Sequence, residues 1–195
     1  MLEKIIQLDK KLFIFLNGLG STAFDDLWLI ITKQIYWAPF FLVIFFLMYK
    51  KTGSRNFMYY IIFTAILILL CDQTANLFKN YFHRLRPCND EEIKSVIRIV
   101  KSSDAYSFFS GHAANSMGTT IFAFLILKKH YLHAYLLFLF PIIFAYSRIY
   151  LGLHFPLDIL TGYAFGATFG FICYKLYQKY VLRTKVHAKP SIHHE

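Results

Sequence analysis

The side chains of this sequence best suited to chemistry lie in residues 147–158, a twelve-residue stretch between two long apolar runs. Arg148 presents a planar fork of hydrogen-bond donors that can hold an oxyanion. His154 can act as a base, an acid or a nucleophile near neutral pH. Asp158 follows four residues later, so a helix that begins near Pro156 would bring its carboxylate under the imidazole ring. There it would fix the tautomer and support positive charge on the ring, as the third member of a catalytic triad does. The alternative is a loop at the membrane interface whose polar side chains only reach toward water.

Two further groups of residues could complete a site for an anion. Lys79 and Arg86 supply fixed positive charge near the end of one apolar run, and Ser110, Gly111 and His112 open the next run. The N-terminus of a helix at Ser110 would also favour an anion. Three cations around one pocket match a dianionic phosphate better than a carboxylate, and they would stabilise the equatorial oxygens during phosphoryl transfer.

The two histidines suggest how such a site could break a bond. The sequence contains no Walker-type glycine loop and no obvious acidic cluster for Mg²⁺ at the site, so neither a nucleotide-driven pump nor a metal cofactor is indicated. A covalent route is therefore favoured, in which one histidine attacks phosphorus and the other protonates the leaving oxygen. No cofactor is expected.

The composition indicates that these residues are carried by a helical membrane protein. Of the 195 residues, 57% are hydrophobic and only 16% are charged, whereas soluble domains have roughly 25% charged residues. Several apolar runs reach the roughly 20 residues that span a bilayer, and they lack the period-2 alternation of strands. The formal net charge of +10 comes from residues that flank these runs, so membrane topology and anionic lipids explain it better than nucleic acid.

Taken in order, the chain predicts one membrane-embedded domain over residues 1–183, followed by a polar disordered tail over 184–195. Residues 1–20 mix apolar and charged side chains and predict an amphipathic helix that lies on the bilayer surface. Five spans are expected after it, over about residues 26–49, 57–78, 111–127, 132–146 and 156–174. The predicted fold class is therefore all-α, a polytopic helical bundle with about five transmembrane helices and an N-terminal interfacial helix.

Two features of these spans bear on packing and on the site. Gly162, Gly166 and Gly170 recur at a spacing of four and predict a flat groove for a neighbouring helix. Asp72 and Asn76 share one helical face with Lys79. Such polar groups at membrane depth could form a clamp between helices or face a cavity.

The distribution of basic residues predicts the orientation. The basic turns near Lys50 and Lys128 and the basic C-terminal segment fall on the same side after five spans, which the positive-inside rule makes cytoplasmic. The long loop 80–110 and the turn 147–157 then lie on the outer side. All the candidate residues named above thus reach one membrane face from four helix ends.

Together these residues resemble the three-part signature of the type 2 phosphatidic acid phosphatase superfamily, which includes membrane lipid phosphatases and soluble vanadium haloperoxidases. The parts are Lys79-x6-Arg86-Pro87, Ser110-Gly111-His112 and Ser147-Arg148-x5-His154-x3-Asp158, and the resemblance covers roughly residues 57–175. It implies that His154 is the nucleophile that forms a phosphohistidine, that Asp158 orients it, and that His112 is the general acid. It also implies that the phosphate is held by Lys79, Arg86, Ser110, Gly111 and Arg148.

One position departs from the family pattern. The family usually has a proline before the serine of the second part, and Phe109 occupies that place here. A phenylalanine leaves the backbone freer than proline does, and we expect its ring to add an apolar wall at the rim of the site.

The sequence therefore predicts an integral membrane enzyme that hydrolyses a phosphate or diphosphate ester of an amphiphilic lipid at the outer face of a bacterial inner membrane. The expected partners are the phosphorylated lipid and the bilayer, with no nucleic acid and no evident protein partner. Compact relatives act on undecaprenyl diphosphate, phosphatidylglycerol phosphate, phosphatidic acid or the phosphates of lipid A. The interpretation leans to undecaprenyl diphosphate, with lipid A as the close alternative.

Other functional classes fit the sequence less well. A transporter of lipid phosphates would use Arg148 and Lys79 as ligands without breaking a bond, but inverted repeats and interrupted midplane helices are not evident, and two histidines would lack a purpose. A soluble haloperoxidase is disfavoured by the five apolar runs. A purely structural membrane protein would not gather its polar residues on one face.

Overall fold

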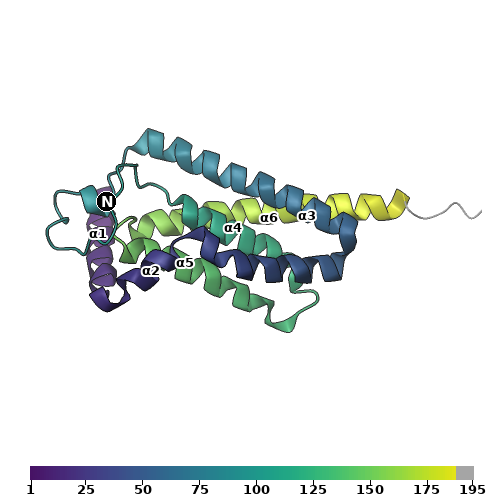
Figure 1. Ribbon diagram of the computed structural model, residues 1–195. Helices are drawn as coiled ribbons and strands as arrows, with labels where there is room; N and C mark the ends of the chain where they lie inside the picture. Colours follow the sequence, from purple (N-terminus) through teal and green to yellow (C-terminus); the bar gives the residue numbers. More distant parts are fainter. Residues whose placement is uncertain (188–195) are drawn as a thin grey trace, which may run out of the picture.

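The computed structural model describes residues 1–187, which form helices and connecting segments with no strand among them (Figure 1). The α-helices in chain order are α1 (Leu2–Gly18), α2 (Asp25–Ile31), α3 (Ala38–Phe82), α4 (Gly111–Leu127), α5 (Leu139–Tyr150) and α6 (Pro156–His187). Short 3₁₀ turns are η1 (Thr22–Phe24), η2 (Gln34–Trp37), η3 (Pro87–Asn89) and η4 (Leu132–Phe138). Helix α6 thus continues into the segment predicted as a polar tail, 184–195, and residues 188–195 of that segment lie outside the described residues.

Helix α3 is a hairpin of two arms. At Gly53 the backbone has φ 77° and ψ 167°, a conformation open to glycine and costly for L side chains. Figure 1 shows the arm before Gly53 running away from α2 and the arm after it returning along the bundle. The two arms correspond to the predicted spans 26–49 and 57–78.

The first predicted span begins later than expected. Residues 25–37 are broken into α2, a short turn and η2, and the long helix starts only at Ala38, with Pro39 in its first turn. Proline has no N–H for the helical ladder and is tolerated at a helix start, so a new helix begins here in place of one continuous span. The predicted fourth span is likewise divided, into η4 and α5.

The closest packing in the bundle is between α4 and α6, and it uses the predicted glycine groove. A Cβ atom at Gly162 would lie 2.6 Å from the Ser110 carbonyl oxygen, and one at Gly170 would lie 2.5 Å from that of Gly118. Only glycine permits such an approach. The contact at Gly162 sets the start of α4 directly against the first turns of α6.

Phe109 belongs to this packed region. Its side chain is fully buried, and its ring stacks on that of Phe165 with the centroids 4.8 Å apart. The expectation that Phe109 forms part of the rim of the site is therefore corrected: the ring fills the core behind the start of α4.

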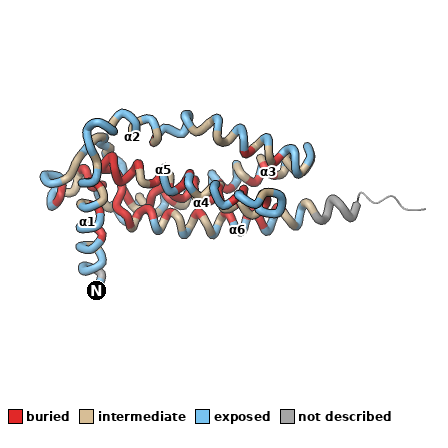
Figure 2. Tube along the Cα trace, turned by 90° about the horizontal axis from the view of Figure 1, so that it is seen from below, coloured by how far each residue is buried: buried red, intermediate tan, exposed pale blue. Residues whose placement is uncertain are grey.

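The outer surface of the bundle is apolar, as expected for a membrane protein. Three helical stretches are long and apolar enough to cross a bilayer, Gln34–Asn89, Leu132–Tyr150 and Pro156–Val181, and a bent pair formed by Glu3–Gly18 and Thr22–Ile31 would make a fourth. Figure 2 shows buried residues along the inside of the bundle and exposed ones around it; the exposed ones include Leu42, Phe46, Leu69, Ile142 and Leu160. The chain is thus an all-α polytopic membrane protein.

Helix α1 lies crosswise at one end of the bundle (Figures 1 and 2). Its buried stripe is Asp9, Phe13 and Asn17, whereas Leu8 and Phe15 are more than half exposed. The Asn17 amide donates to the carbonyl oxygens of Ile149 (3.1 Å) and Tyr150 (3.1 Å) at the end of α5. The N-terminal helix is therefore fixed to the end of the bundle through polar contacts.

Candidate active site

The eight candidate residues come together at the end of the bundle that α1 covers. Lys79 lies in the last turn of α3, Arg148 in the last turn of α5 and Asp158 in the first turn of α6. His112 lies close enough to Arg148, His154, Lys79 and Arg86 to interact with their charges. Ser110 and Gly111 begin α4 beside them. The convergence expected from the order of the spans is thus present in the structure.

His154 and Asp158 form a buried pair at the start of α6. The helix begins at Pro156, and His154 Nδ1 lies 3.4 Å from Asp158 Oδ2. The side chain of His154 is 1% exposed and that of Asp158 is 0% exposed. Because Nδ1 faces the carboxylate, Nε2 is the ring nitrogen available to a substrate.

Burial also sets the protonation state of His154. It lowers the pKa of His154 from the usual value for histidine to about 4, while the hydrogen bond and the charge of Asp158 act in the opposite direction. The positive charges of Arg86 and Arg148 add to the lowering. His154 is therefore neutral at pH 7, the form in which Nε2 carries a lone pair.

The two arginines of the site, Arg86 and Arg148, are held by neutral groups. Arg86 donates from Nε to the Ala105 carbonyl oxygen (2.7 Å), and Arg148 donates from Nη1 to Thr32 Oγ1 (2.6 Å). None of the ion pairs found within residues 1–187 involves Arg86, Arg148 or Lys79. Their positive charge is therefore not neutralised by the protein. In addition, Arg148 Nε is buried without a hydrogen-bond partner in the described part of the chain, and a bound oxyanion would satisfy it.

The start of α4 combines a helix cap with the second histidine. Ser110 Oγ accepts a hydrogen bond from the Ala113 amide (3.4 Å), and the Ser110 amide donates to the Asp158 carbonyl oxygen (3.0 Å). The ring of His112 stacks on Phe144 with the centroids 5.4 Å apart. The Ser110 hydroxyl thus serves as an N-cap and still has its own proton to donate to a ligand.

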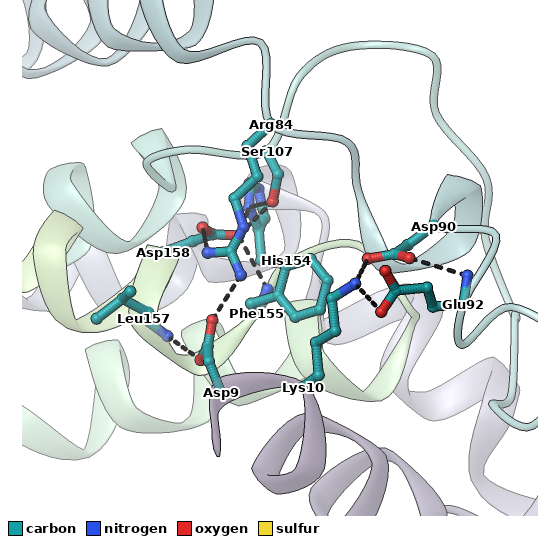
Figure 3. Close-up of polar contacts among 10 residues, drawn as sticks. All are labelled: Asp9, Lys10, Arg84, Asp90, Glu92, Ser107, His154, Phe155, Leu157 and Asp158. Carbon is teal, nitrogen blue, oxygen red and sulfur yellow. Dashed lines mark hydrogen bonds and ion pairs between the residues drawn. The ribbon is translucent and has the colours of Figure 1, made fainter. Parts of the chain in front are cut away.

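Four residues near the site were not singled out from the sequence. Arg84 and Ser107 donate hydrogen bonds to Asp158, and Asp9 accepts one from Arg84 (Figure 3). Thr32 accepts one from Arg148. Arg84 and Ser107 lie within the long loop near the matched motif, which is the one sequence signal that could have drawn attention to them. Asp9 and Thr32 come from segments distant in sequence, and no local pattern marks them.

A cavity of about 720 Å³ opens beside the site, between the two arms of α3 and helices α4 and α5. Its lining is mostly apolar, and it includes Phe144, whose ring stacks on His112. At the same end it includes Asp72 and Asn115, and Asn115 Nδ2 donates to Asp72 Oδ1 (2.7 Å). Asp72 therefore does both of the things considered from the sequence: it clamps α3 to α4 and it faces a cavity.

The described residues contain neither a disulfide nor a cluster of metal-binding side chains. Cys71, Cys88 and Cys173 are all free and buried. Within residues 1–187 no three His, Cys, Asp or Glu side chains form a group that could hold a metal ion.

Comparison with known sequences identifies a family and its named members. The model of the PAP2 superfamily matches residues 56–182. A lipid A 4'-phosphatase of Bacteroides thetaiotaomicron is 31% identical over 94% of this chain and 83% of its own length. A lipid A 4'-phosphatase of Porphyromonas gingivalis is 27% identical over 90% of this chain and 75% of its own. An undecaprenyl-diphosphatase of Sulfolobus acidocaldarius is 24% identical, covering 87% of this chain and 79% of its own.

Solved structures share the fold. A transmembrane PAP2-type phosphatidylglycerolphosphate phosphatase from Bacillus subtilis superposes with a TM-score of 0.69 at 18% identity, over 90% of this chain and 87% of that one. The structure of LpxE from Aquifex aeolicus gives a TM-score of 0.65 at 22% identity, over 86% of this chain and 95% of that one.

Proposed function

The chain belongs to the PAP2 superfamily of membrane lipid phosphatases, and from this premise we propose that it removes a phosphate from lipid A through a phosphohistidine intermediate on His154. The observation that carries the proposal is the neutral, buried His154 with Nδ1 against Asp158 and with unpaired cations around it. Such a group is a nucleophile placed in a site for an anion.

The first chemical step transfers the phosphoryl group to the protein. Nε2 of His154 attacks phosphorus as the bond between phosphorus and the lipid oxygen breaks. His112 gives its proton to the leaving oxygen, so that the lipid leaves as an alcohol. Positive charge develops on the ring of His154, and the Asp158 carboxylate at Nδ1 stabilises it.

The second step returns the enzyme to its starting state. Water attacks the phosphorus of the phosphohistidine, His112 now accepts the proton of that water, and the bond between phosphorus and Nε2 breaks. Inorganic phosphate is released. Through both steps Lys79, Arg86 and Arg148, with the amides and hydroxyl at the start of α4, hold the equatorial oxygens.

We take lipid A as the substrate in place of undecaprenyl diphosphate, to which the sequence interpretation leaned. The relatives that align at 31% and 27% identity are lipid A 4'-phosphatases, and the undecaprenyl-diphosphatase aligns at 24%. The cavity adds a physical reason. Its apolar walls suit acyl chains, and the Asp72–Asn115 pair at its inner end can bond to the hydroxyl and amide groups of an acylated sugar. A polyprenyl chain has no such groups.

We also propose that the site faces the periplasm and needs no metal. The turn between the two arms of α3 and the turn after α4, which carry Lys50 and Lys128, lie at the end of the bundle opposite α1 (Figure 1). The positive-inside rule makes that end cytoplasmic. Three fixed cations supply the positive charge that a metal ion provides in other phosphoryl-transfer enzymes.

The deciding experiment measures phosphate release by the purified protein in detergent with excess EDTA, using wild type and His154→Ala. The substrates are lipid A, undecaprenyl diphosphate, phosphatidic acid and phosphatidylglycerol phosphate. We expect release that survives EDTA, is fastest with lipid A and is lost in the variant. Loss of wild-type release in EDTA would contradict metal independence, and faster release from undecaprenyl diphosphate would contradict the substrate. No release from any of the four would favour a protein that binds lipid phosphates without hydrolysing them.

A matched variant tests the role of the cavity in this choice. Asp72→Asn keeps the shape of the side chain but removes its charge and half of its capacity to accept hydrogen bonds. We expect kcat/KM for lipid A to fall by about tenfold, as for the loss of a hydrogen bond to a charged group, while kcat/KM for phosphatidic acid changes less than threefold. An equal fall for both substrates would assign Asp72 to the helix clamp alone.

A further inference from the structure

Arg84 bridges the buried carboxylate of the catalytic pair, Asp158, and a second buried carboxylate, Asp9 (Figure 3). Its Nη1 donates to Asp158 Oδ1 (2.7 Å) and its Nη2 donates to Asp9 Oδ2 (2.6 Å). The side chains of Asp158 and Asp9 are 0% and 5% exposed. The guanidinium lies 4.0 Å from the centre of the Phe155 ring, so the side chain of Arg84 is fixed on its face as well as at its edge.

The bonds of Asp158 show what this bridge does. Its Oδ2 accepts from the Phe155 amide (2.9 Å) and from Ser107 Oγ, and it is the oxygen that faces His154 Nδ1. Its Oδ1 is engaged by Arg84. With both oxygens engaged the carboxylate cannot rotate, and the oxygen presented to His154 keeps its place.

Asp9 extends the bridge to a second helix. Its Oδ1 accepts from the Leu157 amide (2.8 Å), one of the free N–H groups at the start of α6. Asp9 comes from α1, the crosswise helix at the end of the bundle. One carboxylate therefore holds both Arg84 and the first turn of the helix that carries Asp158.

We propose that Arg84 and Asp9 are positioning residues for the phosphatase reaction: Arg84 fixes the carboxylate of Asp158 against His154, and Asp9 fixes and partly neutralises Arg84. The inference rests on the proposed function in that His154 is taken as the nucleophile. It adds the N-terminal helix α1 to the parts of the molecule on which turnover depends.

The charges explain why both residues are needed. Asp9, Arg84 and Asp158 together carry one net negative charge, which matches the positive charge that develops on His154. Without Arg84, two buried carboxylates would repel each other, and Asp158 would turn away or take up a proton. Without the charge of Asp9, Arg84 would compete with His154 for Asp158.

The test uses single and double variants assayed with a soluble phosphomonoester and with lipid A. We expect Arg84→Met to lower kcat by about 30-fold or more, the scale on which the supporting partners of a reactive histidine act. KM should change less than threefold, because the phosphate is held by other cations. Lysine can reach one carboxylate but lacks the fork to bridge two. The kcat of Arg84→Lys should therefore lie between those of wild type and Arg84→Met.

Asp9 gives the more diagnostic comparison. Asp9→Asn alone should lower kcat by about threefold to tenfold. Added to Arg84→Met it should raise kcat, because it relieves the repulsion between the two carboxylates. A role of Asp9 limited to stability predicts the opposite sign for the double variant.

Lys10→Met is the matched control, since Lys10 is the next residue of α1 and pairs with Asp90 (2.7 Å) and Glu92 (2.9 Å), away from Asp158. It should keep kcat within twofold of wild type. Thermal unfolding in detergent checks that each variant is folded.

Vanadate mimics the five-coordinate phosphorus of the transition state, so its binding gives a readout that does not need turnover. We expect about tenfold weaker binding in Arg84→Met than in wild type. If the wild type cleaves neither substrate, the proposed function is contradicted. The positioning role is then tested by vanadate affinity alone, compared between wild type and Arg84→Met. That role is overturned if folded Arg84→Met keeps both kcat and vanadate affinity within threefold, if its loss lies in KM alone, or if Lys10→Met is as impaired as Asp9→Asn.

Discussion

Arg84 and Arg86 are two residues apart, yet they are in opposite electrostatic states. Arg84 makes ion pairs with two carboxylates, whereas Arg86 and, from α5, Arg148 bind a backbone carbonyl and a threonine hydroxyl. We call Lys79, Arg86 and Arg148 the cationic group and Asp9, Arg84 and Asp158 the paired group. His154 lies between them, within electrostatic reach of members of both.

The difference teaches how one residue type serves two purposes in a buried site. An arginine paired with carboxylates has its charge neutralised locally and acts as a rigid brace. An arginine held by neutral acceptors is equally well oriented, but its charge remains available to an anion. The partner of each guanidinium, rather than its place in a motif, decides which of the two it is.

The largest effect should come from the residue that both groups serve. His154→Ala removes the nucleophile, and we expect kcat to fall by about 10⁴-fold or more. Both groups of charges remain, so inorganic phosphate should still inhibit binding of substrate with an affinity within about tenfold of wild type. Phosphate release and competition by phosphate are measured on the same preparations.

His133→Ala serves as the control, because His133 is an exposed histidine in η4 that is not among the candidate site residues, and its replacement should leave both quantities unchanged. Appreciable turnover in folded His154→Ala would remove the covalent mechanism and with it the division into two groups.

A smaller effect is expected from the paired group. Asp158→Asn keeps the size of the side chain but cannot support a positive ring, and in a triad such a change costs about 10⁴-fold in kcat. Here we expect about 10²-fold to 10⁴-fold, with KM changed less than threefold because the cationic group is intact. Steady-state kinetics with a soluble phosphomonoester separates the two parameters. A variant with unaltered kcat would take Asp158, and the brace behind it, out of the mechanism.

The cationic group could be predicted from the sequence because local patterns carry it. The start of α4 at Gly111 and the start of α6 at Pro156 follow from capping and proline rules, and the predicted third span, 111–127, has the bounds of α4. Since consecutive spans alternate in direction, the ends that carry Lys79, His112 and Arg148 had to meet.

The paired group could not be predicted in this way. The sequence places Asp9 among the charged residues of an amphipathic helix that lies on the bilayer surface, and the charged face of such a helix is expected to face water. In α1 the polar Asp9 and Asn17 face the protein and Leu8 and Leu12 are exposed, because lipid accepts apolar side chains and the protein interior offers the hydrogen bonds.

Hydrogen-bond partners that are far apart in the sequence could not be predicted for a related reason. Thr32 holds Arg148 across 116 residues, and Asn115 bonds to Asp72 across 43. No periodicity along the chain encodes such pairs, which depend on how the arms of α3 fold back at Gly53. The cavity between those arms could not be predicted from sequence patterns for the same reason.

A carboxylate introduced beside Arg148 should turn a member of the cationic group into a paired arginine. Thr32 is 4% exposed and its Oγ1 accepts from Arg148 Nη1 at 2.6 Å. In Thr32→Asp the new charge would neutralise Arg148, and we expect inorganic phosphate to bind about tenfold to 100-fold more weakly. Thr32→Asn, of the same shape without the charge, should weaken it less than threefold. Equal effects of the two variants would show that size, not charge, matters at this position.

The smallest effect concerns the balance of the two groups on His154 itself. Only neutral His154 can attack phosphorus, so kcat/KM is full above the pKa of His154 in the free enzyme and falls tenfold per pH unit below it. Burial and the charges of Arg86 and Arg148 lower that pKa to about 4, while Asp158 opposes the shift. An exposed histidine, with a pKa near 6.5, would already have lost about tenfold at pH 5.5. We therefore use an aryl phosphate, whose leaving group needs no proton from His112. For this substrate we expect kcat/KM, corrected for its second ionisation near pH 6, to stay constant from pH 7 to 5 and to decline near pH 4. An acidic limb near pH 6.5 would show that Asp158 fully offsets the effects of burial and of the cationic group on the pKa of His154.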